Sequence, residues 1–441
     1  MLAISIIIFF VLTVFNFQIA GKKMTYPPFI FCAIWLIVSL ARIIFTQFYL
    51  KDLFELHWDT YLLFIGGCVV ATLAGYISLL QFSFSAIAIS IAHKSYKIED
   101  EIINSKLSIY IRIGLMVFCV MVFPFFIKYL VDVVLPGEVE NVFKSIRYET
   151  AVNKVGFGVY GYMVTLSCFV GLLCGYVYWQ RKTKTNRTIY IIAIVISLIY
   201  AFSTMGRSSI LMAICLNLAM FLVQNKKVSI KQFVLPLFIF VFIFLGIGIL
   251  LDKGGSVNSS FTDNVDASIE TFAEYLLTPM NAIDHVLHQP LLVHEEGRRT
   301  LRFFYVFGHT IGLNNVNLND FDIVDSFIFV PYPVNVYTIY NPYVRDFGPL
   351  YSLFWIFIFM LIHSNAFMKL KYSAKAFMPR VIYSFMFFPL ITVFFNDQYI
   401  SLLSTWIQLL VIVGLIYLIF WSKLKGVFYI FFPYKSIQQH H

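Results

Sequence analysis

Arginines are the residues of this chain whose type and placement most clearly indicate a binding chemistry. Four of them fall in one polar stretch, residues 252–346, and two lie in shorter polar connections. A guanidinium keeps its charge at physiological pH, and its planar fork pairs with phosphate oxygens through two hydrogen bonds. We therefore predict a site for a di-anionic ligand such as pyrophosphate, built from Arg207, Arg147, Arg298, Arg299, Arg302 and Arg345.

Each of these arginines also has a structural interpretation. Arg207 follows one apolar run and precedes another, so its side chain could simply extend to the membrane interface. The cluster at 298–302 could be a solvated patch or contact lipid headgroups, and Arg345 could pair with the adjacent Asp346. The sequence alone leaves these alternatives open.

A second group of polar side chains could exchange protons with a hydroxyl group. A carboxylate near the membrane boundary can have the raised pKa that suits a general base. The predicted catalytic candidates are Asp346, Asp325, Glu274 and His309, and Asp397 is a further one. Nothing in the sequence chooses among them, and each could equally be structural.

An aromatic and amide-rich strip closes the polar stretch. Tyrosine rings offer stacking faces and amides offer hydrogen bonds, which is what a carbohydrate site uses, yet an aromatic belt at a membrane interface has the same composition. We predict glycan contacts for Asn335, Tyr337, Tyr340 and Tyr343, with packing as the alternative.

The sequence gives no indication of a cofactor or of a metal. It contains no Walker A loop and no dinucleotide-binding glycine pattern, and all six cysteines fall in apolar runs. The Asp-x-Asp pattern at 320–322 is interpreted as a solvated turn. A solvated polar face is also the interpretation of Asp284, His285, His288, His294 and Glu295, in preference to a metal site.

The elements that must position these residues are membrane helices. Hydrophobic residues make up 60% of the 441, charged residues 12%, and the mean hydropathy is +0.82, which excludes a soluble domain. Apolar runs of the roughly 20 residues that cross a bilayer as a helix recur along the chain. The alternating pattern of a membrane β-barrel does not. We predict an all-α integral membrane protein.

Eleven spans are predicted, over residues 2–20, 28–47, 59–80, 108–134, 155–179, 188–206, 208–224, 233–251, 347–368, 380–396 and 402–421. Lysines and arginines cluster in every second connection, as the positive-inside rule requires. This pattern predicts an outer N-terminus, an inner C-terminus and an outer position for the long loop. The net charge of +9 is then explained mostly by inner-face residues beside anionic lipid.

The predicted organisation has three parts: eight spans in 1–251, a large outer loop in 252–346, and three spans with a short inner tail in 347–441. Within the loop, apolar residues from Asn264 to Leu287 recur at spacings of three and four. They predict an amphipathic helix, kinked at Pro279, that could lie on the membrane or cover a cavity. Gly171 and Gly175 have the spacing of a close helix contact.

Several short motifs, together with this topology, resemble a known family. Asn335-Val-Tyr-Thr338 and Tyr343-Val-Arg-Asp-Phe-Gly348 close a long outer loop that runs straight into a span. Along the whole chain this arrangement resembles the bacterial oligosaccharide repeat-unit polymerases of the Wzy type. The corner Met205-Gly-Arg-Ser-Ser209 is similar to the Gly-Arg-Ser/Thr turn of many of them, and Arg147 to Gly158 fits their Arg-x10-Gly pattern.

The resemblance implies an inverting, metal-independent glycosyltransferase with a GT-C-like fold in the bacterial inner membrane. It would move a growing glycan from undecaprenyl pyrophosphate onto the non-reducing end of the next lipid-linked repeat unit, on the periplasmic side. A Wzz-type regulator of chain length and membrane lipid are the expected partners, and nucleic acid is not.

Two rival functions stay open. A related O-antigen ligase would use the same donor but hand the glycan to lipid A core. A flippase or other transporter of lipid-linked oligosaccharide would place charged residues deep inside several spans, whereas few besides Arg42 and Arg112 lie there.

Overall fold

The computed structural model describes residues 1–84, 106–134, 145–146, 149, 157–224, 261–288, 297–317, 327–372 and 377–422. Its longer helices are α1 (Leu2–Ile19), α2 (Pro27–Phe48), α3 (Trp58–Phe84), α5 (Lys106–Val134), α7 (Gly161–Gln180), α8 (Lys184–Ser203), α9 (Arg207–Gln224), α11 (Phe261–His288), α14 (Pro349–Tyr372), α15 (Phe377–Ile391) and α16 (Leu403–Ser422). Shorter elements are η1 (Gly158–Tyr160), α12 (Arg302–Thr310), α13 (Asn341–Phe347) and the antiparallel strands β1 (Ile328–Phe329) and β2 (Pro333–Val334).

The predicted spans agree with these helices. Seven described helices are long and apolar enough to cross a membrane, namely α1, α2, α3, α5, α7 with η1, α8 and α14. Three shorter apolar helices, α9, α15 and α16, coincide with further predicted spans. The predicted span 233–251 lies outside the described residues. The chain is therefore a membrane-embedded, all-α protein.

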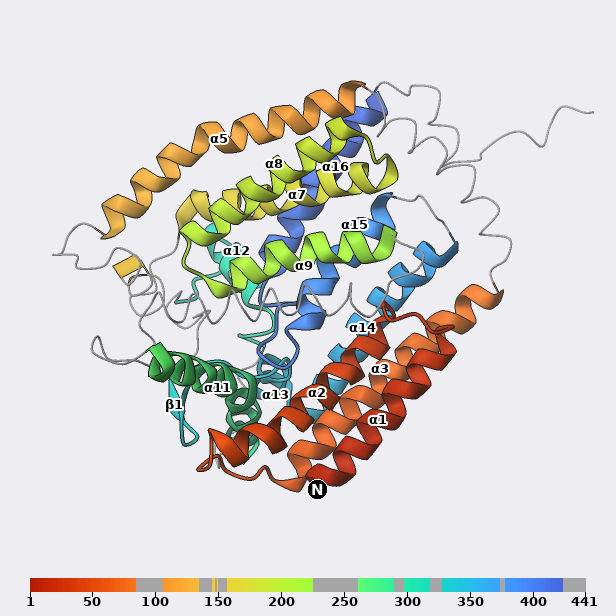
Figure 1. Cartoon of the computed structure of the whole chain (residues 1–441), viewed down its shortest axis with the longest axis vertical. Coiled ribbons are helices and arrows are strands. Elements are labelled where there is room, and N and C mark those ends of the chain that lie inside the picture. Colours follow the sequence, from red (N-terminus) through yellow and green to blue (C-terminus); the bar gives the residue numbers. More distant parts are fainter. Residues whose placement is uncertain are drawn as a thin grey trace, which may run out of the picture.

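Helices α1, α2, α3 and α14 pack together as one group (Figure 1). Asn16 of α1 donates to Thr72 of α3 at 2.8 Å, and its amide also lies 3.6 Å from the Cys32 sulfur on α2. Between membrane helices such hydrogen bonds and close packing replace the hydrophobic effect, because lipid tails are as apolar as the side chains. Buried polar residues therefore join the members of this group.

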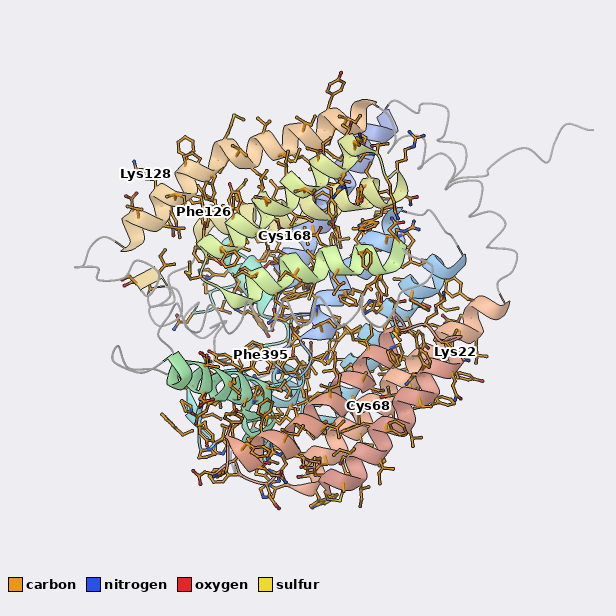
Figure 2. The ribbon with its side chains drawn as sticks, viewed as in Figure 1. Lys22, Cys68, Phe126, Lys128, Cys168 and Phe395 are labelled. Carbon is orange, nitrogen blue, oxygen red and sulfur yellow. The ribbon has the colours of Figure 1, made fainter. Side chains whose placement is uncertain are left out.

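A second group contains α5, α7, α8 and α9, with α16 packed on α7. The predicted contact at Gly171 and Gly175 is confirmed: added Cβ atoms would lie 3.2 Å from Asn217 of α9 and 2.8 Å from Tyr190 of α8. Figure 2 labels Cys168 inside this group and Cys68 inside the first. Helix α15 contacts α9 as well as α14 and α2, so it joins the two groups.

The connections at one end of the helices meet the polar stretch. Beside segment 49–57, Arg42 donates to Asn281 of α11 at 2.8 Å, and both side chains donate to the Phe54 carbonyl. After α15, Val393 accepts a hydrogen bond from the Ile339 amide at 2.9 Å. We call this end the α11 side. Among the described residues, the predicted grouping of these three connections on one side is confirmed, and which side faces outward stays a prediction.

Helix α11 is the amphipathic helix predicted from Asn264, and it contains Pro279. Its apolar face is fully buried at Leu277, Met280 and Ile283. It contacts α2, α3, α13 and β2, so it packs across the ends of the first helix group (Figure 1). The polar stretch is thus anchored to the membrane helices through a shared hydrophobic core.

We expect single cysteines at the two ends of α2 to react from opposite sides of the membrane. All six native cysteines are buried, so a membrane-impermeant maleimide finds little background. Glu55→Cys, on the α11 side, should be labelled in intact cells, and Lys23→Cys only after permeabilisation; both native side chains are exposed. Labelling of both variants in intact cells would contradict the arrangement.

Candidate functional site

A cavity of about 410 Å³ lies on the α11 side, between α11 and the segment around β2. Its polar lining comes from Glu270, Glu274 and Tyr275 of α11 and from Asn335, which follows β2. Threonines at 271 and 278 and apolar residues of 327–336 complete the wall. A concave site with a few convergent polar groups in an otherwise apolar setting is the usual form of a small-molecule site.

The cavity is acidic. Glu270 and Glu274 are four residues apart, so they project from the same face of the helix. The pKa of the Tyr332 hydroxyl is raised, first by burial and then by the negative charges of Asp52, Glu270 and Glu274. The arrangement suits the binding of polar, hydroxyl-rich groups and the acceptance of a proton from one of them.

The wall of the cavity is held by ring stacking. Tyr275 stacks on Phe395, which follows α15, with ring centroids 5.8 Å apart and planes 23° apart. Figure 2 labels Phe395 close to α11. The cavity face of α11 is therefore fixed to the connection between α15 and α16.

Two predicted site residues come together in this cavity, Glu274 and Asn335. The sequence analysis did not name Glu270 or Tyr275. The signal that could have found Glu270 is its four-residue spacing from Glu274 on the predicted amphipathic helix. No comparable signal pairs α11 with Asn335, because about sixty residues separate them.

Asp346 is placed as a structural acceptor. It is buried in α13, and its two carboxylate oxygens accept the backbone amides of Arg299 and Thr300, at 3.3 and 2.6 Å. These bonds fix the turn that begins at Gly297, whose φ of 81° favours glycine. Asp346 thus pairs with the backbone of the turn that carries the arginines.

The arginines of the polar stretch lie around this turn. Arg298 is exposed, Arg299 is half-buried, and Arg302 opens α12. Arg345 donates from Nε to Asn341 at 2.9 Å, and its guanidinium lies 5.2 Å from the centre of the Tyr337 ring. A guanidinium stacked and bonded in this way is held in a fixed orientation.

The three predicted glycan-binding tyrosines lie in the core. Tyr340 packs against Trp35 and Phe64, with ring centroids 5.8 and 5.6 Å away, and fills the space left by Gly67. Tyr337 and Tyr343 are also buried. Packing, the alternative interpretation of this strip, is the arrangement that the structure has.

Asp397 closes the same core. Its carboxylate accepts from the Tyr343 hydroxyl at 2.9 Å, and from the amides of Tyr399, Ile400 and Ser401 at 3.0, 3.2 and 2.9 Å. Burial raises the pKa of Asp397, and the hydrogen bonds it accepts act in the opposite direction. These hydrogen bonds fix the segment that leads into α16.

The remaining candidates are partly outside the described residues. Asp325 and Arg147 lie there, as do the 320–322 pattern, His294 and Glu295. His309 lies in the last turn of α12 and does not line the cavity, and its Nδ1 has no hydrogen-bond partner among the described residues. Arg207 is the first residue of α9, and only its backbone is described.

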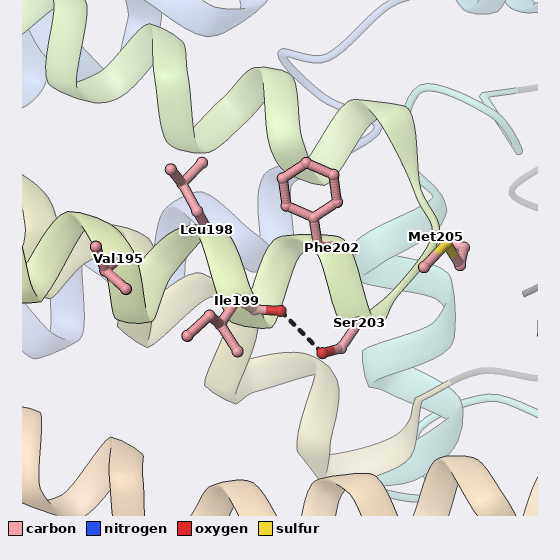
Figure 3. A pocket seen from close by; sticks show the side chains of 6 residues that line it. All are labelled: Val195, Leu198, Ile199, Phe202, Ser203 and Met205. Carbon is pink, nitrogen blue, oxygen red and sulfur yellow. Dashed lines mark hydrogen bonds between the residues drawn. The ribbon is translucent and has the colours of Figure 1, made fainter. Parts of the chain in front are cut away.

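The predicted tight corner at Arg207 is confirmed as the turn between α8 and α9. Met205 has a φ of 50°, and the Gly206 amide donates to the Thr204 hydroxyl at 3.1 Å. An apolar groove of about 420 Å³ follows α8 to this corner, lined by Val195, Leu198, Ile199, Phe202, Ser203 and Met205 (Figure 3). The Ser203 hydroxyl is turned to the Ile199 carbonyl at 2.8 Å, so the groove presents almost no polarity. Helix α12 lies near the corner in both Figure 1 and Figure 3.

No family model matches this chain, and neither a curated protein nor a solved structure is significantly similar to it.

We predict that the Tyr343 and Asp397 pair stabilises the core beneath the site. Asp397→Ala leaves buried donors of several residues without an acceptor, so it should destabilise the fold by about 2–4 kcal/mol, and Tyr343→Phe by about 1 kcal/mol. Thermal unfolding in detergent should show the larger fall in midpoint for Asp397→Ala. Equal midpoints for both variants and the parent chain would contradict this role.

Proposed function

We propose that the chain is a polysaccharide repeat-unit polymerase of the O-antigen type. It would transfer a growing glycan from undecaprenyl pyrophosphate onto the non-reducing end of a new lipid-linked repeat unit, on the periplasmic face of the inner membrane. The observation that carries the proposal is the acidic cavity of Glu270, Glu274 and Asn335 on the α11 side of a membrane-embedded helical protein. A hydroxyl-rich acceptor fits such a cavity, and a carboxylate in it can take the proton of the attacking hydroxyl.

Glu274 is the general base in this proposal. The acceptor hydroxyl forms the new bond to the anomeric carbon while the bond from that carbon to the pyrophosphate oxygen breaks. The hydroxyl proton passes to Glu274, and the electron pair leaves with the pyrophosphate. Attack from the face opposite the leaving group inverts the anomeric centre, as the resemblance implies. Asn335, on the facing wall, supplies hydrogen bonds to the sugar.

The donor lies toward the arginines. A pyrophosphate leaving group gains negative charge during transfer, and guanidinium groups stabilise that charge. Arg207 opens α9 at the end of the apolar groove on α8, an arrangement that suits a prenyl chain in the groove with its pyrophosphate at the corner. The second source of positive charge is the turn that carries Arg298 and Arg299. Arg302 follows this turn in sequence, and Arg345 is the neighbour of Asp346, which bonds to the turn.

A Glu274→Gln variant should lose polymer while its protein level stays unchanged. Removing a general base lowers the rate of transfer by about 10²–10⁴-fold, and glutamine keeps the size of the side chain. The measurement is the length distribution of lipopolysaccharide on a silver-stained gel. Asp266→Asn, an exposed substitution on the same helix outside the cavity lining, is the matched control. Parental chain lengths in Glu274→Gln would contradict the role of Glu274.

An Arg207→Ala variant should abolish long-chain polysaccharide and leave the protein in the membrane. Its guanidinium is expected to hold the pyrophosphate, so its loss removes charge stabilisation that other residues cannot replace at the corner. Normal modal chains from this variant would exclude the anion-binding role.

A deletion strain separates the proposal from its rivals. Loss of a polymerase leaves core plus one repeat unit, whereas loss of a ligase leaves bare core. Loss of a flippase leaves no repeat unit on the outer face at all. Either of the last two phenotypes would contradict the polymerase.

A further inference from the structure

Two histidines and two aspartates meet where α3 begins and α11 ends. His57 precedes α3 directly, and Asp59 lies in the first turn of that helix. Asp284 and His288 lie in the last turns of α11. His57 Nδ1 lies 2.9 Å from Asp284 Oδ2, and His288 Nε2 lies 3.0 Å from Asp59 Oδ2. Ligand atoms of His57, Asp284 and His288 all lie within 4.8 Å of one another. The sequence analysis interpreted the α11 members as a solvated face, and it did not pair them with His57 or Asp59.

His288 faces an acceptor at each ring nitrogen. Its Nδ1 lies 2.7 Å from the Asp284 backbone carbonyl, which can only accept a hydrogen bond, so this nitrogen carries a proton. In the neutral ring Nε2 then has a lone pair, and it points at the Asp59 carboxylate, which is an acceptor too. At 3.0 Å this lone pair and the carboxylate repel unless a proton on Nε2 or a metal ion lies between them. Metal-binding histidines are commonly oriented in this way, because a backbone carbonyl accepts the proton of the ring nitrogen that does not bind the metal.

Asp284 is positioned by its neighbours. Its Oδ1 accepts the His57 backbone amide at 3.0 Å and the Thr60 hydroxyl, which leaves Oδ2 directed at the His57 ring. The Asp284 side chain is largely buried, at 10% exposure, while His57 and His288 keep 58% and 34%. The site thus has one rigid ligand and two that can adjust, and it opens to solvent, so an ion can enter.

The charge of the cluster calls for a divalent cation. Two carboxylates and two neutral imidazoles carry a net charge of −2, which one divalent ion neutralises. Protons offset this charge only in part: one protonated ring leaves −1, and protonating both would place two imidazolium rings with centroids 3.9 Å apart, where they repel. A metal ion leaves both rings neutral. Imidazole together with carboxylate is a ligand set that zinc favours.

We propose that His57, Asp284 and His288 form a zinc site that joins α11 to the start of α3, with the Asp59 carboxylate beside His288. Ligands 2.0–2.2 Å from a tetrahedral zinc ion stand roughly 3.4 Å apart, so a small rotation of the two exposed histidines closes the present arrangement on an ion. This zinc site is structural and lies outside the cavity, so the proposal is independent of the chemistry performed in the cavity. It fixes the end of the helix whose middle carries Glu270 and Glu274.

The test is the zinc content of the full-length protein, purified in detergent, stripped with a chelator and dialysed against zinc. We expect one zinc ion per chain by mass spectrometry and a rise in the thermal unfolding midpoint on reloading. The double variant His57→Ala/His288→Ala should lose both. Thr60→Val, which removes only a hydrogen bond to a ligand, should weaken zinc binding about 10-fold to 100-fold.

His285→Ala is the matched control, because His285 is an exposed histidine on the same helical turn that is not part of the cluster. It should bind zinc like the parent chain, and the terminal His440 and His441 are common to every variant. Equal zinc content in the double variant and in His285→Ala would overturn the proposal. So would a stripped parent chain that takes up no zinc. A calcium or magnesium ion bound in place of zinc would also overturn it, because those ions prefer oxygen ligands.

Discussion

The constraint on which the rest of the structure depends is the burial of residues 337–346 among the membrane helices. Tyr340 packs against the stacked rings of Trp35 and Phe64 and occupies the space beside Gly67, where any Cβ would lie 1.9 Å from its hydroxyl. Tyr343 donates to the buried Asp397. A polar segment that ends in this core cannot move independently of the helices. Everything else on the α11 side is positioned relative to this anchor.

The anchor explains how a polar segment can form a defined site on a membrane protein. Through Asp346 it holds the turn that carries Arg298 and Arg299, and through α13 it supports α11. Helix α11 is fixed a second time by Arg42 and Asn281, and a third time by the histidine and aspartate cluster at its end. A helix held at several points can present Glu274 to the cavity, opposite Asn335, with the fixed geometry that the proposed transfer requires.

The sequence was sufficient for the helices and for much of the amphipathic segment, because hydropathy and its period depend on neighbouring residues alone. The boundaries of α1, α2 and α9 differ from the predicted spans by about one residue. Contacts between distant segments could not be predicted in this way: His57 and Asp284 are 227 residues apart. The partners of Asp346 show the same limit, because its carboxylate accepts backbone amides 46 and 47 residues away. The tyrosines show a different limit, since a ring that binds sugar, lies at an interface or packs in a core has the same signature in sequence.

Reconstitution of the purified chain with its proposed substrate tests the central claim most directly. Vesicles containing the protein would receive undecaprenyl-pyrophosphate-linked repeat units on the α11 side, with no nucleotide and no other enzyme present. We expect a ladder of longer lipid-linked glycans and release of undecaprenyl pyrophosphate, one molecule for each new linkage. Repeat units that cross the bilayer at unchanged length, with no undecaprenyl pyrophosphate released, would contradict it.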